Sequence, residues 1–346
     1  MSAQHGRLVR LGSWASRAGS LDPEYPLLRR GLHVGIALIL VCGVGLAVSA
    51  TLHELPDVEW RWRPATLLAG IAAVALFMLL SGEIWRRILH ALGPYLPAPV
   101  ATRIWFVSGL GRFVPTSLLV PVVRSAMSER EGVPKRICLA SIAYELAAAI
   151  TGALVVGAYG VITLPDLQGH WERWLVIALP VLALLLMQPA VFHNVADLVL
   201  VRLGRERLPR SLSTSRVPEF VGLYCVAYVV AGLSAYALGQ CFYPIGADDL
   251  VTAIGAYALG GMLGLIAFML PAGLVAREAG IAVGLTAIMP TAPAVAIAVL
   301  VRMVQIGVEL TAVAITMAHS RASRDSDQPG VPGTPGSSPP STVARS

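Results

Sequence analysis

The chain has 346 residues, of which 56% are hydrophobic and 13% are charged, and its mean hydropathy is +0.70. Soluble domains carry about 25% charged residues, so this composition excludes an ordinary soluble protein and predicts an all-α polytopic membrane protein. The net charge of +6 does not indicate a nucleic-acid partner, because almost all the basic residues lie in short loops beside apolar segments.

Long apolar windows follow one another along the chain, each approaching or exceeding the roughly 20 residues that a membrane-spanning helix needs. They are Gly31–Leu52, Ala65–Trp85, Ile137–Leu164, Trp174–Phe192, Phe220–Tyr243, Leu250–Met269 and Pro293–Ala318. Residues 1–30 are polar and arginine-rich, which predicts a cytoplasmic arm, and residues 319–346 are rich in Ser, Pro and Gly, which predicts a disordered tail. The membrane domain is therefore expected over 31–318. The glycines in Gly255–Gly264 are typical of close helix packing.

The positions of lysine and arginine set the expected orientation. With a cytoplasmic N-terminus, most of these residues fall in inner loops, and the outer loops hold only Arg61, Arg63 and Arg173. This asymmetry follows the positive-inside rule. Arg321 and Arg324 after the last window favour a cytoplasmic C-terminus, so we expect about eight crossings of the cytoplasmic (inner) membrane.

Residues 88–123 lie between two stretches that both have cytoplasmic signatures, so they must cross an even number of times or enter and leave on one side. A re-entrant hairpin satisfies this condition, with arms that meet near Pro94–Pro99 and a second arm over Ala101–Val123. Gly273–Pro290 either crosses the membrane or makes a second re-entrant turn. Two interrupted segments in corresponding halves predict two pseudo-repeats around a transport site.

An arginine lies inside the apolar run Gly109-Leu110-Gly111-Arg112-Phe113-Val114-Pro115. An unpaired arginine near the bilayer centre costs about 2.5–3.5 kcal/mol on insertion scales. Arg112 must therefore reach the membrane surface, bind an anion or line a wet cavity, and both a phosphate-binding role and a snorkelling role are open. The residues that interrupt the helix here, and are expected to act as hinges, are Gly109, Gly111 and Pro115.

A second stretch, from Leu270 to Gly280, also combines an arginine with glycine and proline in an apolar run. Its expected hinge residues are Pro271 and Gly273. Arg277 and Glu278 are adjacent and point to different faces of a helix, so each is expected to have its own partner. Arg302 and Glu309 are seven residues apart and share one helix face. They can line a polar stripe with Arg277 or Glu278 opposite.

Arg124 lies at a helix end, where it is either a topological anchor or a phosphate ligand. Glu145 lies deeper, and it is expected to pair with Arg112 or Arg124, or to accept a proton during a transport cycle. The full set of candidate substrate-binding residues is Arg112, Arg124, Glu145, Arg277, Glu278, Arg302 and Glu309. No catalytic residue, metal site or cofactor is expected, since the four cysteines show no CxxC spacing.

The conspicuous elements are Gly109-x-Gly111-Arg112-x-x-Pro115, then Arg124, Gly132 and Glu145, and later Leu270-Pro271-x-Gly273-x-x-x-Arg277-Glu278 followed by Arg302 and Glu309. This pattern resembles the lysylphosphatidylglycerol synthase transmembrane region family, also described as flippase-like, which includes the membrane half of the multiple peptide resistance factors. The resemblance covers most of 31–318. It implies an inner-membrane protein that binds or moves an anionic, aminoacylated or polyprenyl-linked lipid. Full-length resistance factors carry an aminoacyl-transferase domain that is not expected here, so the resemblance favours a stand-alone translocator over an enzyme.

Two alternatives remain open beside a lipid flippase. One is a membrane glycosyltransferase that uses a polyprenyl-phosphate sugar, with Glu54, Asp57 or Glu59 as its acidic residue. The other is a non-transporting partner of a cell-envelope protein complex, which would dock through the basic loop 193–219. The sequence has no Walker-type nucleotide motif, so a transporter would draw its energy from a gradient or a partner protein.

Overall fold

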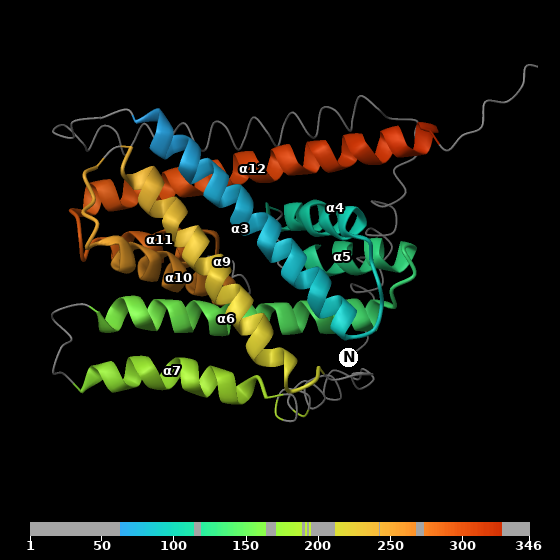
Figure 1. Ribbon diagram of the computed structural model, residues 1–346, viewed down its shortest axis with the longest axis horizontal. Helices are drawn as coiled ribbons and strands as arrows, with labels where there is room; N and C mark the ends of the chain where they lie inside the picture. The colour runs from blue at the N-terminus through green and yellow to red at the C-terminus, as the bar shows by residue number, and fades with distance from the viewer. Residues whose placement is uncertain are drawn as a thin grey trace, which may run out of the picture. The chain divides into compact units, whose positions relative to one another are not determined.

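The computed structural model describes residues 63–113, 119–163, 171–188, 212–241, 243–267 and 273–326, with positions 191 and 194. The regular structure in these residues is helical (Figure 1). The elements are α3 (Pro64–Ala91), α4 (Ala98–Gly109), the 3-10 helix η1 (Leu110–Phe113), α5 (Leu119–Arg130), α6 (Lys135–Ile162), α7 (Glu172–Leu186), α9 (Arg216–Gly239), α10 (Leu250–Ala267), α11 (Gly273–Leu285) and α12 (Thr291–Ser326). The predicted span Gly31–Leu52 and the acidic residues Glu54, Asp57 and Glu59 lie outside the described residues.

Four of the described helices are long and apolar enough to cross a membrane, namely α3, α6, α9 and the Thr291–His319 part of α12. Shorter apolar helices run from Arg173 to Leu186 and from Leu250 to Ile266. The chain is thus a multi-pass membrane protein, while the count of eight crossings remains a prediction. Helix α12 continues to Ser326, into the region expected to be a disordered tail, and residues 327–346 lie outside the described residues.

Local sequence explains several helix ends. Helix α3 begins with Pro64. Proline has no backbone N–H, and in the first turn of a helix this costs no hydrogen bond, because an N–H there would have no intrahelical acceptor. Just after α3, Gly93 has a φ of 118°, a left-handed conformation that favours glycine. Helix α5 ends in the same way at Gly132, whose φ is 83°. There the Val133 amide donates a hydrogen bond of 3.0 Å to the carbonyl of Ser128, which closes the last turn.

The core lies where the long helices pack together. Helices α3 and α9 lie side by side (Figure 1), and they run antiparallel, because Thr66 near the start of α3 contacts Cys241 beyond the end of α9, with 3.2 Å between Oγ1 and Sγ. Met78 of α3, Tyr144 of α6 and Ala227 of α9 are each fully buried. These helices therefore form a packed scaffold on which the shorter helices rest.

Glycines set the closest helix contacts. A Cβ added to Gly160 of α6 would lie 2.6 Å from the Cα of Gly255 in α10. A Cβ added to Gly280 of α11 would lie 2.9 Å from the Cα of Gly260 in α10. Both contacts need a hydrogen atom in place of a side chain. The packing role expected for Gly255–Gly264 is therefore what the structure shows.

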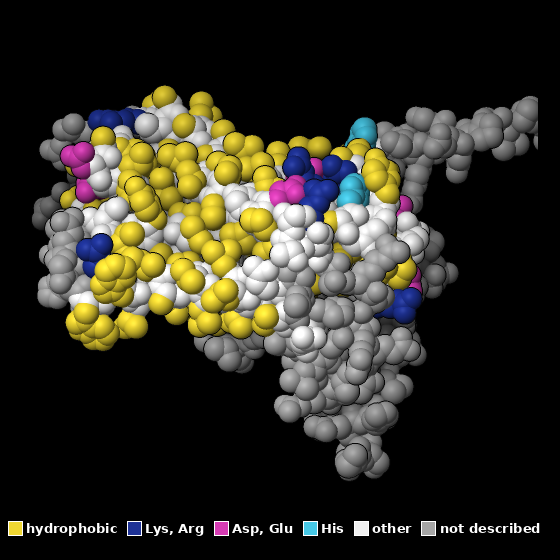
Figure 2. All heavy atoms as spheres, turned by 60° about the horizontal axis from the view of Figure 1, so that its bottom comes forward, with side chains coloured by type: hydrophobic (Ala, Val, Ile, Leu, Met, Phe, Trp, Pro, Cys, Tyr) yellow, Lys and Arg dark blue, Asp and Glu magenta, His cyan; other side chains and the backbone are white. Residues whose placement is uncertain are grey.

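The outer faces of the helices are apolar. On α7, large side chains are more than half exposed, namely Leu175, Leu179, Leu182, Leu185 and Leu186. Figure 2 shows a face of the molecule on which hydrophobic side chains cover most of the described surface, while charged side chains gather towards its ends. An apolar surface of this extent is typical of contact with lipid.

Helices α4 and α5 form a short helical hairpin. Each has 12 residues, about 18 Å at 1.5 Å per residue, whereas the hydrocarbon core is about 30 Å thick. The two helices run antiparallel, because Arg103 near the start of α4 forms an ion pair of 2.8 Å with Glu131 just after α5.

This hairpin adds a chain reversal that the sequence did not predict. The chain turns back after α3, between Ala91 and Ala98, so that Trp105 of α4 lies against Gly82 of α3, as expected for arms that meet near Pro94–Pro99. The expected second arm, Ala101–Val123, is divided into two helices, because the chain turns back again between Gly109 and Leu119. The physical reason lies in the glycines, since a Cβ on Gly111 would lie 3.0 Å from the backbone nitrogen of Val120. A residue without a side chain at position 111 therefore allows the backbone at the start of α5 to come so close.

Helices α10 and α11 form the second hairpin and pack against each other closely. Helix α11 has 13 residues, about 20 Å, so it is too short to cross a hydrocarbon core of about 30 Å alone. Each half of the described chain thus contains one broken hairpin. The re-entrant placement of both hairpins in the membrane remains a prediction.

Candidate functional site

The buried charges of the two hairpins meet on one face of α12. Arg302, Gln305 and Glu309 are spaced i, i+3 and i+7, so they lie on the same side of the helix. Gln305 is 5% exposed and Glu309 is 1% exposed. Each of the three contacts a residue from one of the hairpins. We call Arg112, Arg277, Glu278, Arg302 and Glu309 the α12 charge cluster.

The first hairpin contributes Arg112. Its Nη2 lies 3.0 Å from Oε1 of Glu309, and its Nε donates a hydrogen bond of 2.9 Å to the carbonyl of Gly109. The Arg112 side chain remains 24% exposed, whereas Glu309 is almost fully buried. Among the described residues, no hydrogen bond to Glu309 Oε1 is formed. Glu309 is therefore held mainly by the charge of Arg112, and the guanidinium keeps access to a ligand.

Gly109 makes this ion pair sterically possible. A Cβ at this position would lie 2.7 Å from Oε1 of Glu309 and 2.8 Å from Nη2 of Arg112. The residue ends α4, and Gly111 follows within η1, so both expected hinge glycines lie at the break between α4 and α5. The two expected hinge prolines, Pro115 and Pro271, lie outside the described residues, and the remaining expected hinge, Gly273, is the first residue of α11.

The second hairpin contributes Arg277, in the first turns of α11, which begins at Gly273. Its Nη1 donates to Oε1 of Gln305, and its Nη2 donates to the hydroxyl of Tyr257 at 2.5 Å. The guanidinium also lies 5.2 Å from the centre of the Tyr257 ring. A Cβ on Gly264 would lie 2.7 Å from the Cβ of Arg277. Each hairpin thus places one arginine against α12 beside a glycine.

Glu278 and Arg302 form the remaining pair of the cluster, with 3.4 Å between Oε1 and Nε. As expected from their adjacency, Arg277 and Glu278 have separate partners. The charges of Arg112, Arg277 and Glu309 also act on Arg302, so all five residues share one electrostatic environment. Counted over the described residues, the three arginines and two glutamates of the α12 charge cluster carry an excess of one positive charge. Such clusters in membrane-embedded segments are typical of substrate and ion pathways.

Arg124 and Glu145 form a second, closed arrangement. Arg124 is 5% exposed and donates to Oε2 of Glu145 and, at 3.0 Å, to the hydroxyl of Ser108. Its guanidinium lies 5.0 Å from the ring centre of Trp85. The indole N–H of Trp105 donates to Oε1 of Glu145 at 2.9 Å. Because both carboxylate oxygens have donors and the arginine is enclosed, we interpret this pair as a structural link between α5 and α6.

The site includes residues that the sequence did not single out. Gln305 and Tyr257 hold Arg277, and Ser108 and Trp105 hold Arg124 and Glu145. A neutral polar side chain inside an apolar window is the signal that would have found Gln305. Within the described part of the chain, no group of three or more His, Cys, Asp or Glu side chains is placed to hold a metal ion.

Comparison with known proteins gives one finding. The family model described as the lysylphosphatidylglycerol synthase TM region matches residues 32–312. The match includes both hairpins, all seven candidate residues and most of the chain, and it confirms the resemblance inferred from the motifs. A search among curated proteins gave no match.

Proposed function

The chain belongs to the lysylphosphatidylglycerol synthase transmembrane region family, and from this membership together with the α12 charge cluster we propose that it binds and translocates a membrane lipid. The lipid is anionic, aminoacylated or polyprenyl-linked, and its phosphate binds at Arg112. We place the protein in the cytoplasmic membrane with both termini inside, because the lysines and arginines of the loops follow the positive-inside rule.

The observation that carries the proposal is the excess of positive charge on the buried face of α12. Three arginines face two glutamates there, and the Arg112 side chain is 24% exposed, compared with 17% for Arg302 and 18% for Glu278. A guanidinium binds phosphate through paired, charge-assisted hydrogen bonds. One phosphate would balance the excess charge, which is costly at membrane depth. A lipid that carries a phosphate group therefore fits the cluster better than one that carries none.

The contact between the first hairpin and α12 couples lipid binding to movement of the hairpin. A phosphate at Arg112 competes with Glu309 for the same guanidinium, so binding weakens the contact between the first hairpin and α12. The break between α4 and α5 lies directly beside this contact. In many transporters broken helices form the substrate site, and alternating access comes from movement of one repeat against the other around that site. Lipid binding and hairpin movement are thus coupled through one ion pair.

Lipid binding is tested by mass spectrometry of the lipids that co-purify with the protein in mild detergent. Wild type is compared with Arg112→Ala and Arg277→Ala, and Arg103→Ala is the matched control, since Arg103 is also ion-paired and 22% exposed. One anionic lipid class should be retained by wild type and by the control and be lost from the other two variants. If the bound lipids are unselective and unchanged by Arg112→Ala, the cluster is structural and the proposal is wrong.

Translocation needs a separate measurement. The protein is reconstituted into vesicles that contain a small amount of the retained lipid with a fluorescent headgroup-proximal label, and the label in the outer leaflet is quenched chemically. Wild-type protein should raise the fraction of label that becomes accessible with time, and Arg112→Ala should not. If the fraction of accessible label is the same in vesicles with wild-type protein, with the variant and without protein, the chain binds lipid but does not transport it.

A further inference from the structure

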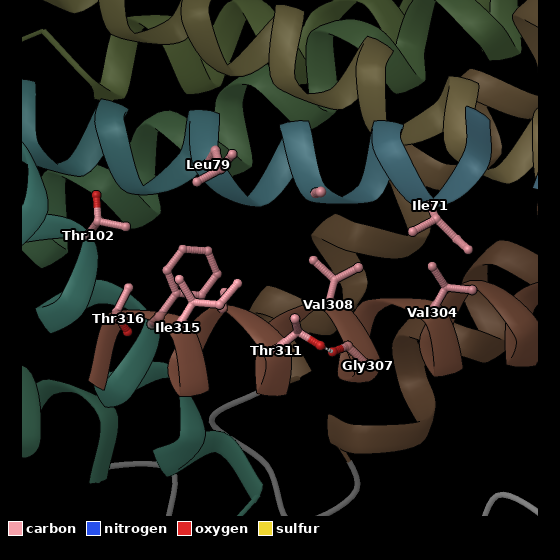
Figure 3. A pocket seen from close by; sticks show the side chains of 12 residues that line it. Ile71, Leu79, Thr102, Val304, Gly307, Val308, Thr311, Ile315 and Thr316 are labelled. Carbon is pink, nitrogen blue, oxygen red and sulfur yellow. Dashed lines mark hydrogen bonds between the residues drawn. The ribbon is translucent and has the colours of Figure 1, made fainter. Parts of the chain in front are cut away.

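We propose that the groove between α3, α4 and α12 holds one hydrocarbon chain of the lipid whose phosphate binds at the α12 charge cluster. This inference rests on the proposed function and extends it, because it identifies where the apolar part of the substrate lies. We call this groove the chain groove. Its walls are formed by Ile71, Ala75 and Leu79 of α3 and by Val304, Val308 and Ile315 of α12 (Figure 3).

The chain groove is large enough for a ligand and almost wholly apolar. Its volume is about 710 Å³, within the range of roughly 300–1,000 Å³ for small-molecule sites. Two of its threonines direct their hydroxyls back to their own helix. Thr311 donates to the carbonyl of Gly307 at 2.8 Å, and Thr316 donates to that of Val313 at 3.0 Å. These threonines therefore have satisfied hydroxyls, which suits a hydrocarbon occupant.

The groove is about as long as one leaflet of the hydrocarbon core is thick. Its two long walls belong to α3 and α12, which are both long and apolar enough to span the membrane. From Val304 to Thr316 the groove follows α12 for about 18 Å at 1.5 Å per residue, compared with about 30 Å for the whole hydrocarbon core. Leu79 is 52% exposed and Ile315 is 63% exposed, so the groove is open along its side to the surrounding bilayer.

One wall of the groove leads to the charge cluster. Thr102, Phe106 and Gly109 are spaced i, i+4 and i+7 on α4, so they lie on one face of that helix. The first two line the groove, and the third contacts Glu309 and Arg112. On α12, the lining residue Val308 directly precedes Glu309. The apolar groove and the α12 charge cluster therefore lie close together, on neighbouring faces of α12 that α4 contacts through Phe106 and Gly109.

The groove acts through shape, because lipid tails are as apolar as the leucines around them and gain little from leaving the bilayer. A chain that fits between α3 and α12 fixes the height and direction of the lipid. Its headgroup is then held near Arg112. The chain groove would thus orient the substrate, while the α12 charge cluster recognises its phosphate.

The test fills the groove without disturbing the fold. Gly307 lines the groove, and a Cβ added to it meets no atom within 4 Å, so Gly307→Leu starts its side chain in open space and extends it into the groove. Gly222 on α9 also has open space at its Cβ and does not line the groove. Gly222→Leu is therefore the matched control for adding a leucine to an exposed helical glycine.

The readout is photolabelling in vesicles of phosphatidylglycerol that carries a diazirine in one acyl chain. Labelled peptides are identified by mass spectrometry, and peptides of α7, with its exposed leucines, serve as the reference for ordinary bilayer contact. In wild type and Gly222→Leu, peptides with residues 71–79 and 304–316 should be labelled more strongly than those of α7. In Gly307→Leu this excess should be lost.

Two outcomes overturn the inference. Groove peptides that are labelled no more than α7 would show that no lipid chain is held there, and that another segment of this chain or a second copy covers the groove. An excess that Gly307→Leu leaves unchanged would show that the chain lies elsewhere. The proposed function fails separately, when retention of anionic lipid does not depend on Arg112, whatever the labelling of the groove.

Discussion

Replacing Arg124 with methionine should destabilise the fold strongly, whereas replacing Arg112 should not, although both arginines interrupt apolar segments. Arg124 is 5% exposed and has partners on every side, while Arg112 is 24% exposed. Methionine keeps most of the apolar volume of arginine, so the cavity left behind is small. The loss then comes mainly from Glu145, which loses its cationic partner while the N–H of Trp105 remains a donor to it.

The magnitude follows from the burial of the pair. Removing one partner of a buried ion pair costs about 3–5 kcal/mol, because the other charge is left uncompensated. The guanidinium also lies over two tryptophan rings, of Trp85 and Trp105, a contact worth about 0.5–2 kcal/mol. By contrast, Arg103→Ala breaks a partly exposed pair with Glu131 and should cost about 0–1 kcal/mol.

A double-mutant cycle measures the coupling between the two residues. Arg124→Met and Glu145→Leu are made singly and together, and the free energy of unfolding is measured by titration with SDS in mixed micelles, followed by tryptophan fluorescence. The double variant should be more stable than the sum of the single losses predicts by about 0.5–3 kcal/mol, since no lone charge remains buried. Additive losses, or a loss below about 1 kcal/mol for Arg124→Met, would refute the interpretation of this pair as a buried structural link.

Glycine contacts give two further predictions. Gly109→Ala should separate Glu309 from its arginine, because the new Cβ would lie 2.7 Å from Glu309 Oε1, so lipid retention should fall as in the arginine variant while Gly222→Ala retains wild-type lipid. Unchanged lipid retention by Gly109→Ala would show that the ion pair can shift without consequence. Gly160→Val should force α6 away from Gly255 and lower the free energy of unfolding by about 1–3 kcal/mol, measured by the same SDS titration, and a neutral effect would mean that the two helices can part freely.

The long helices could be predicted from the sequence because membrane insertion depends on local composition. A window of about 20 apolar residues must form a helix in lipid, where every backbone polar group needs an internal partner. Ala65–Trp85 lies within α3, and Phe220–Tyr243 overlaps most of α9. The additional chain reversal between Gly109 and Leu119 was not predicted, since it depends on the close contact between Gly111 and the backbone of Val120.

The candidate charges were also predictable one by one, since a charge in an apolar run is visible without any structure. Their partners were not. Glu145 could pair with either arginine, and the structure pairs it with Arg124 and pairs Arg112 with Glu309. Gln305 escaped notice because it carries no charge and stands out less in an apolar window than the arginines and glutamates do. Partner choice depends on which helices meet, and this is not encoded in any single segment.

By itself, the sequence determined that this is a multi-pass membrane protein of known family with arginines in broken apolar segments, because insertion cost and motif spacing are local properties. Only the tertiary structure decided that the hairpins bring Arg112 and Arg277 to one face of α12, and that Arg124 is enclosed elsewhere. The physical reason is that which charged side chains pair depends on the distances between them in the folded chain. Packing across glycines such as Gly109 and Gly264 sets the distances that decide which charges meet.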